Sequence, residues 1–207
     1  MADLSKIYHF RMVHIENIPH VLLHGITHAQ SANANAAYVP IGDSSLISTR
    51  NAFVLSNDRR LGDYIPFYFA KRTPMLYVVQ KGFNWVAPTP AQDIVYCVSS
   101  VQKIMEYPLN FVFTNGHAVD GFTSQYDCND IGSINDLLDW DAIKAKFWKS
   151  ETDLDLKRRK EAEFLIEQDV PFGALLGFVV YNQDAKQKLT TWGVSDQQVQ
   201  IRPNYYF

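Results

Sequence analysis

Seven short runs rich in aromatic and β-branched residues recur along the chain, and they constrain its fold more than any other feature. They are residues 6–13, 64–70, 74–80, 93–100, 110–115, 175–182 and 198–207. Runs of this composition favour β-strands. Several follow each other too closely to leave room for the crossover helices that a parallel sheet requires. The sequence therefore predicts a mixed α/β (α+β) fold, with largely antiparallel strands and helices packed around them.

Helical patterns lie between these runs, at residues 15–26, 100–108, 133–148, 158–171 and 183–193. In the first, Asn17 is a candidate N-cap, Pro19 fits the first turn and Gly25 can end the helix. The last long acidic–apolar phrase, RRKEAEFLIEQDVP from Arg158, is interpreted as one amphipathic helix. Residues 29–63 have the weakest periodicity, and a long irregular segment in a compact domain is usually functional or mobile.

Bulk properties set limits on the class of protein. A chain of 207 residues with 47% hydrophobic residues predicts a single domain, residues 1–207, with a sizeable core. No apolar run approaches the roughly 20 residues that span a bilayer, and the first residues lack the form of a signal peptide. We therefore expect a cytoplasmic protein with no membrane association.

The charge balance bears on nucleic-acid binding. The net charge of −3 argues against a dedicated duplex-DNA binder, because neutralising phosphates requires an excess of basic residues. Basic residues nevertheless cluster at Arg59–Arg60, Lys71–Arg72 and Lys157–Lys160. Each cluster is either a solvated face or part of a local groove, and a nucleic-acid partner would have to be held by such a groove.

Histidines are concentrated near the start of the chain. His20, His24 and His28 have the i, i+4, i+8 spacing of one helix face, but Gly25 interrupts the helix and no cysteine or acid pair completes a metal site. We therefore expect no metal. His9 differs because it lies inside an apolar strand, where it is either a satisfied core residue or an orienting donor in a cleft.

Three other residues are candidates for chemistry. Glu163 adjoins the apolar run 164–166, so it is either a solvated helix edge or a partly desolvated acid at a pocket rim. His117 follows a strand and the Asn115–Gly116 turn, a common place for site residues. Arg50 lies in a polar segment and is either solvated or a fixed cation for a phosphate or a developing negative charge.

Several stretches, taken together and in order, resemble the DarT family, DNA ADP-ribosyltransferases that are the toxins of DarT/DarG toxin–antitoxin systems. They include IYHFRMVHIENIPHVLLHGI, GDYIPFYFAKRTPMLY, NFVFTNGHA, LDWDAI and KRRKEAEFLI. The resemblance covers nearly the whole chain and is closer to the thymidine-modifying branch than to the guanosine-modifying branch. It implies an ADP-ribosyltransferase-like fold, with a split, strongly bent β core and NAD in its cleft.

The resemblance also implies roles for individual residues. Glu163 matches the catalytic glutamate, and Arg50 matches the catalytic arginine, which is followed by Asn. Residues 29–49 match the loop that covers NAD. His9 matches the histidine that holds the nicotinamide ribose. The full set expected to bind NAD is His9, Ser44, Ser48, Tyr68, Met75, Tyr77 and His117.

Two positions depart from the family pattern. Gly62 stands where relatives often have histidine before the Asp-Tyr pair, and Lys157 stands where a relative has arginine six residues before the glutamate. Both changes leave the catalytic residues intact. They put the DNA contacts and the sequence preference in doubt.

The activity implied by the resemblance is NAD-dependent mono-ADP-ribosylation of thymidine in single-stranded DNA, by a toxin whose partner is the macrodomain antitoxin DarG. Glu163 would take the proton from thymine N3, and Arg50 would stabilise the charge on the base. We expect the DNA groove to use residues 71–85 and Lys157–Lys160. The alternatives are a transferase of the same fold that acts on guanosine in DNA, on RNA or on protein, an RNA phosphotransferase, or a non-catalytic nucleic-acid-binding domain.

Overall fold

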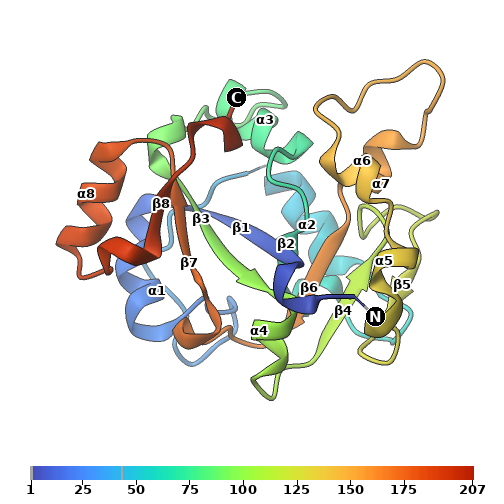
Figure 1. Cartoon of the computed structure of the whole chain (residues 1–207), viewed down its shortest axis with the longest axis horizontal. Helices are drawn as coiled ribbons and strands as arrows, with labels where there is room; N and C mark the ends of the chain where they lie inside the picture. The colour runs from blue at the N-terminus through green and yellow to red at the C-terminus, as the bar shows by residue number, and fades with distance from the viewer. Residues whose placement is uncertain (1, 43) are drawn as a thin grey trace.

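One eight-stranded sheet runs through the computed structural model, which describes residues 2–42 and 44–207, with side chains omitted for 44–46 (Figure 1). Its order is β5-β4-β6-β2-β1-β3-β7-β8. Neighbouring strands are antiparallel except β7 and β8, which confirms the largely antiparallel fold. The strands are β1 (Tyr8–His14), β2 (Tyr64–Tyr68), β3 (Ile94–Ser100), β4 (Phe111–Thr114), β5 (Gln125–Tyr126), β6 (Glu163–Glu167), β7 (Gly177–Val180) and β8 (Val199–Ile201).

The sheet consists of two halves that meet at a narrow seam. Strand β1 pairs with β3 at seven positions and β2 pairs with β6 at five, whereas β1 and β2 pair only at Phe10 and Tyr68. Across this seam the Arg11 guanidinium donates a hydrogen bond of 2.9 Å to the carbonyl of Pro66. The predicted split β core is thus confirmed.

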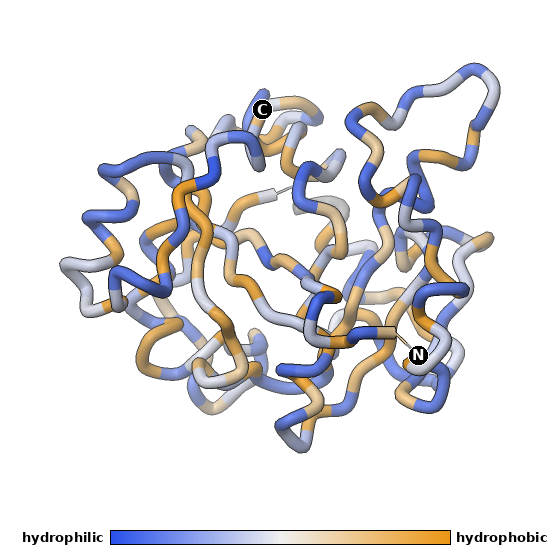
Figure 2. Tube along the Cα trace, in the orientation of Figure 1, coloured by the Kyte–Doolittle hydropathy of each residue, from blue (hydrophilic) through white to orange (hydrophobic). Residues whose placement is uncertain are grey.

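Helices cover both faces and the ends of the sheet. They are α1 (Ile18–His24), α2 (Ser44–Ala52), α3 (Pro74–Lys81), α4 (Val101–Met105), α5 (Ile134–Leu137), α6 (Trp140–Lys144), α7 (Leu156–Lys160) and α8 (Gln183–Thr191). Figure 2 shows apolar residues along the central strands and hydrophilic residues along much of α8. None of the helices in the described ranges combines the length and apolar character needed to cross a membrane.

The segment 158–171 corrects the sequence interpretation. It is not one helix: α7 ends at Lys160, and Glu163 begins strand β6. Phe164, Leu165 and Ile166 are all fully buried, because β6 is an inner strand covered on both faces. A strand of this kind has no alternation of polar and apolar residues, so its pattern does not distinguish it from a buried helix.

Residues 74–80 were also wrongly predicted, as a strand, and form helix α3. The Thr73 hydroxyl accepts a hydrogen bond of 3.1 Å from the amide of Leu76, and Pro74 occupies the first turn. Gly82 ends the helix with a positive φ of 72°, which glycine adopts without steric cost. These end signals outweigh the β propensity of the tyrosine and valines between them.

Two local details also differ. Helix α2 forms within residues 29–63, which were expected to be irregular. Asn17 does occupy the N-cap position of α1, but its side chain makes no capping bond. Instead it fastens the backbone of Val39, donating to the carbonyl at 2.8 Å and accepting from the amide at 2.9 Å.

Candidate active site

An ion pair between Arg50 and Glu163 forms the centre of the site. Arg50 Nη1 lies 3.0 Å from Glu163 Oε1, and Nη2 lies 2.7 Å from Oε2. Glu163 is fully buried, and 16% of the Arg50 side chain is exposed. A bidentate ion pair of this kind fixes the planar guanidinium and the planar carboxylate in one geometry. The two residues singled out from a helix pattern and a polar segment are therefore in direct contact.

The sheet places Glu163. It begins β6 directly opposite Tyr68, the last residue of β2, and its amide donates a hydrogen bond of 3.1 Å to the Thr114 hydroxyl at the end of β4. Its Oε1 also accepts a hydrogen bond of 2.9 Å from the amide of Ala118, just beyond β4. Three strand ends thus hold the carboxylate. Among the described residues, Oε2 accepts only from Arg50 and keeps acceptor capacity for a ligand.

Electrostatics keep the Arg50 guanidinium charged. Burial on its own would lower the pKa of Arg50, but the Glu163 carboxylate raises it above its ordinary value, so the guanidinium stays charged. Burial, reinforced by the Glu163 charge, raises the pKa of the Tyr68 hydroxyl. Tyr68 therefore stays a neutral hydrogen-bond donor, and its hydroxyl lies 3.6 Å from the sulfur of Met75 on α3.

Two further titratable groups border the pair. Burial lowers the pKa of His117, and the Glu163 charge only partly opposes this shift, so the imidazole is neutral near pH 7. Burial raises the pKa of Glu161 to about 7, and Lys157 and Glu163 contribute in opposite directions. Glu161 was not among the residues predicted from the sequence. The sequence feature that could have identified Glu161 is its distance of two residues from Glu163. Two residues at this spacing lie on the same face of a strand but on different faces of a helix.

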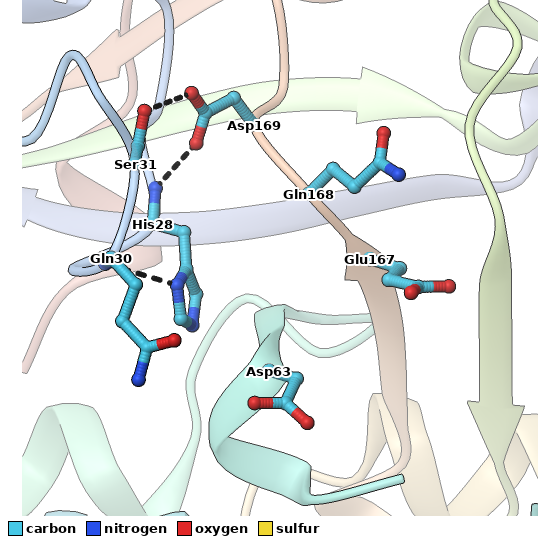
Figure 3. Close-up of a pocket in the computed structure, with 7 residues that line it drawn as sticks. All are labelled: His28, Gln30, Ser31, Asp63, Glu167, Gln168 and Asp169. Carbon is cyan, nitrogen blue, oxygen red and sulfur yellow. Dashed lines mark hydrogen bonds between the residues drawn. The ribbon is translucent and has the colours of Figure 1, made fainter.

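Hydrogen bonds fasten the segment 29–42 at several points, and its last residues approach Tyr68 and Met75. At its start, Asp169 accepts from the amide of His28 at 2.7 Å and from the Ser31 hydroxyl at 2.5 Å (Figure 3). These residues line a pocket of about 410 Å³ beyond the far end of β6, where Asp63 and Glu167 also lie. At its end, Ile41 is buried in the cluster that contains Tyr68.

Gly42 lies beside Met75, because a Cβ built on it would be 3.6 Å from the methionine methyl group. The segment therefore runs from the Asp169 pocket to the Tyr68–Met75 contact. The expected residues Ser44 and Ser48 come next, on α2. The side chain of Ser44 lies outside the described residues. Ser48 is two positions from Arg50 on the same helix, and its exposed side chain points away from the Arg50 side.

The structure does not bring His9 to this site, which corrects the expectation. Tyr68 pairs with both Phe10 and Glu163, so those three side chains share one face of the sheet. His9 is fully buried on the other face, stacked on Phe164 at 4.6 Å and against the edge of Phe67 at 4.8 Å. Burial lowers its pKa to about 3, against a weak opposing contact with the Ser100 backbone. His9 is thus a neutral core residue.

Tyr77 also lies away from the ion pair. It is two positions from Met75 on α3 and points to the other side of that helix. Its ring contacts Phe83, Trp148 and Phe207 at centroid distances of 5.1–5.6 Å. A role for Tyr77 in binding NAD stays a prediction, and any such contact would be made at a distance from Glu163.

The basic cluster 157–160 is mostly engaged within the protein. Arg158 pairs with Asp155, and Arg159 pairs with Asp139, Asp153 and Asp155. Lys160 is buried and donates to the carbonyls of Ile143 and Ala145, at 3.1 and 2.6 Å. Lys157 is exposed and forms none of the ion pairs found among the described residues. A role for Lys157–Lys160 in DNA binding stays a prediction, and in the protein alone most of these charges are already paired. Within the described ranges, no three His, Cys, Asp or Glu side chains are grouped to hold a metal ion.

Comparison with known proteins gives a consistent picture. The family model described as "ssDNA thymidine ADP-ribosyltransferase, DarT" matches residues 10–207. A DNA ADP-ribosyl transferase of Escherichia coli O127:H6 is 30% identical over 96% of this chain and 92% of its own length. Another, from Thermus sp. (strain 2.9), is 32% identical over 86% of this chain and 82% of its own.

Solved structures with the same fold include ligand complexes. Thermus sp. 2.9 DarT in complex with ADP-ribosylated ssDNA superposes with a TM-score of 0.81 at 25% identity, covering 97% of this chain and 96% of that chain. The same protein in complex with NAD+ superposes with a TM-score of 0.78 at 25% identity, covering 100% and 99%.

Proposed function

This chain belongs to the DarT family of DNA ADP-ribosyltransferases, and from that premise we propose that it transfers ADP-ribose to thymidine in single-stranded DNA. The enzyme uses NAD+ as the ADP-ribose donor. The observation that carries the proposal is the buried, bidentate Arg50–Glu163 ion pair, which lies beside Tyr68 and the covering segment 29–42.

The reaction breaks one bond and forms one. The bond from ribose C1′ to the nicotinamide nitrogen breaks, and nicotinamide leaves as a neutral molecule with the bonding electrons. Thymine N3 forms the new bond to C1′ and loses its proton. Glu163 accepts that proton at Oε2, the oxygen with free acceptor capacity. Before the transfer, the same carboxylate stabilises the positive charge that develops on the ribose.

Arg50 orients the carboxylate while the donor binds. As the thymine proton leaves, negative charge moves onto the base carbonyls, and the guanidinium beside Oε2 stabilises it. Tyr68 supplies a neutral hydroxyl and an aromatic face next to the acid, with Met75 behind it. The covering segment 29–42 excludes water, which would otherwise compete as the nucleophile.

The acceptor is single-stranded because of the position of the target atom. Thymine N3 lies on the Watson–Crick edge and is hidden in a duplex, so a duplex substrate would require base flipping at a cost of a few kcal/mol. The family model's description, which names single-stranded DNA and thymidine, supports this choice.

The biological role we propose is that of a toxin whose mark is removed by a partner. ADP-ribose on N3 blocks base pairing, so the product stops replication. A relative from Thermosipho africanus is a fusion of a DNA ADP-ribosyl transferase with a DNA ADP-ribosyl glycohydrolase, and this chain covers 39% of its length. A macrodomain glycohydrolase of the DarG type is therefore the expected partner.

An acceptor panel tests the proposal. The protein is incubated with adenylate-labelled NAD+ and four oligonucleotides of equal length: a mixed single strand, its duplex, a single strand without thymine and the RNA equivalent. We expect label on the first alone. Label on the thymine-free strand would assign the enzyme to guanosine, and label on RNA would overturn the choice of DNA.

A further inference from the structure

We propose that six aromatic side chains around α3 and the α6–α7 loop, with the lysines and Arg72 between them, form the surface that binds the single strand next to the modified base. The inference rests on the proposed function and deepens it. We call this surface the aromatic ledge, and its aromatic members are Tyr77, Phe83, Trp85, Phe147, Trp148 and Phe207.

Four of the rings form one continuous cluster. Tyr77 stacks on Phe83 at 5.4 Å and meets Trp148 and Phe207 edge-on, and the last two meet each other at 5.8 Å. The other members extend the cluster into solvent: Phe147 is 71% exposed and Trp85 fully exposed. Soluble proteins rarely expose apolar side chains together without a partner. Every nucleobase has a π face, so exposed rings of this kind suit stacking without a fixed sequence.

The backbone holds Trp85 outward at an energetic cost. Asn84 and Trp85 have φ values of 57° and 64°, a conformation that side-chain-bearing residues seldom adopt. The turn is closed by a hydrogen bond of 3.1 Å from the Val86 amide to the Phe83 carbonyl. Strained residues of this kind concentrate at ligand-binding positions.

Charge on the ledge complements DNA rather than protein. No acidic residue occurs between Asp63 and Asp93, a stretch that contains Lys71, Arg72 and Lys81. Residues 142–150 likewise contain three lysines, at 144, 146 and 149, and no acid. In a protein with a net charge of −3, both stretches are locally basic. Asp153 and Asp155, which follow in the α6–α7 loop, are paired with Arg159 and Arg158. A phosphate backbone is the partner that such a surface attracts.

The cations are placed among the rings. The Arg72 guanidinium stacks on Phe207 at 4.2 Å, Lys71 lies over Tyr205 at 4.5 Å, and Lys146 lies over Phe147 at 5.4 Å. Among the described residues, Arg72 has no carboxylate partner, and its Nε is buried without a hydrogen-bond acceptor. Rings that alternate with unneutralised cations are the pattern by which proteins hold single strands.

Both arms of the ledge are attached beside the site. Lys71 and Arg72 follow Tyr68 by three and four residues, a reach of at most ~14 Å. The other arm is attached through Lys160, which lies three residues before Glu163. Its ammonium group donates hydrogen bonds to the carbonyls of Ile143 and Ala145. In Figure 1 the α6–α7 loop rises beside α3 and the C-terminal residues, on the opposite side of the molecule from α8. A strand that leaves the Glu163 site in this direction meets the ledge first.

The test compares exposed ledge substitutions with substitutions on α1 and α8. The variants are Phe147→Ala with Trp85→Ala, and Lys146→Gln with Lys149→Gln. The matched controls are Leu23→Ala, which removes another exposed apolar side chain, and Lys186→Gln with Lys188→Gln. Binding of a fluorescent mixed-sequence single strand is measured by anisotropy over a salt series, without NAD+. Steady-state transfer then gives separate KM values for DNA and NAD+.

We expect the aromatic variant to weaken DNA binding about 5-fold or more. The lysine variant should reduce the slope of log affinity against log salt by about 1.4, since each single-strand phosphate contact contributes ~0.7. In both, the KM for DNA rises, while the KM for NAD+ and the controls stay within twofold of wild type.

Unchanged DNA binding in both ledge variants would overturn the inference, as would a rise confined to the KM for NAD+, which would assign the ledge to the donor. Failure of the proposed function has a different signature. In that case the wild-type protein transfers label to no single strand, and the anisotropy series still decides whether the ledge binds DNA.

Discussion

Arg50 and Glu163 lie 113 residues apart in the chain and form a bidentate ion pair in which Glu163 is fully buried. Helix α2 supplies the guanidinium and the first residue of β6 supplies the carboxylate. Neither charge has another neutralising partner among the described ion pairs. The pair therefore couples the helix that follows the covering segment to the centre of the sheet.

The pair has a consequence for stability. Arg50→Met removes the cation and leaves a buried carboxylate uncompensated, which should lower the free energy of unfolding by about 3 kcal/mol. Combining it with Glu163→Gln should recover much of that loss, because the double variant has no buried charge. Urea unfolding of the two single variants and the double variant measures the coupling. Strictly additive losses would mean that the two groups do not stabilise each other.

Glu161 should make stability depend on pH. Burial raises its pKa in the folded protein to about 7 from an ordinary 4.5. The folded state thus binds a proton more tightly than the unfolded state does, so the contribution is full below about pH 4.5 and is lost as the pH rises through 7. Compared with Glu161→Gln, the wild-type protein should lose stability between pH 5 and 8. A constant difference between the two proteins across that range would contradict the assignment.

His9 tests which face of the sheet binds the donor. Because its ring is packed between Phe67 and Phe164, away from Glu163, His9→Phe should leave the KM for NAD+ unchanged. The swap keeps an aromatic ring in the core, so stability should change by less than about 1.5 kcal/mol. The readouts are initial rates over a range of NAD+ concentrations and thermal unfolding. A tenfold higher KM in a stably folded variant would return His9 to the donor site.

Asn17 should act on NAD+ through the covering segment. Its two hydrogen bonds to Val39, at 2.8 and 2.9 Å, hold residues 29–42 against the start of α1. Asn17→Ala should raise the KM for NAD+ several-fold with a smaller effect on kcat, and cost about 1–3 kcal/mol of stability. Hydrogen exchange should become faster in residues 29–42 and stay unchanged in β6. Slow exchange throughout, with an altered KM, would place the effect of Asn17 elsewhere.

Much of the fold could be predicted from the sequence where a run had one reading. Strands β1, β2, β3, β4 and β7 follow from their aromatic and β-branched composition, and α1 follows from Pro19 and Gly25. Residues 74–81 and 158–171 could not be assigned in this way. Strand β6 is buried on both faces, so it has no periodicity. In residues 74–81 the tyrosine and valines favour a strand by composition, and only the end signals at Thr73 and Gly82 indicate the helix.

The site residues likewise include some that could be placed from the sequence and some that could not. Glu163, Arg50 and Tyr68 lie together, with Met75 in contact with Tyr68 and His117 near the Glu163 charge. The face on which a strand residue points depends on register, and a slip of one residue exchanges the two faces. That is why His9 was misplaced: the single pairing of Phe10 with Tyr68 decides its side, and no local pattern reveals that pairing. The charge partners of Arg158 and Arg159 are likewise set by the fold of residues 139–155.

The most direct test of the central claim is the rate of ADP-ribose transfer by Glu163→Gln, measured by mass spectrometry of a thymine-containing single strand incubated with NAD+. The substitution keeps the size of the side chain and removes the proton acceptor. We predict that wild type adds one ADP-ribose per target thymine and that the variant, with unchanged DNA binding and a cooperative unfolding transition, adds none. Transfer by the folded variant at the wild-type rate would show that Glu163 is not the base.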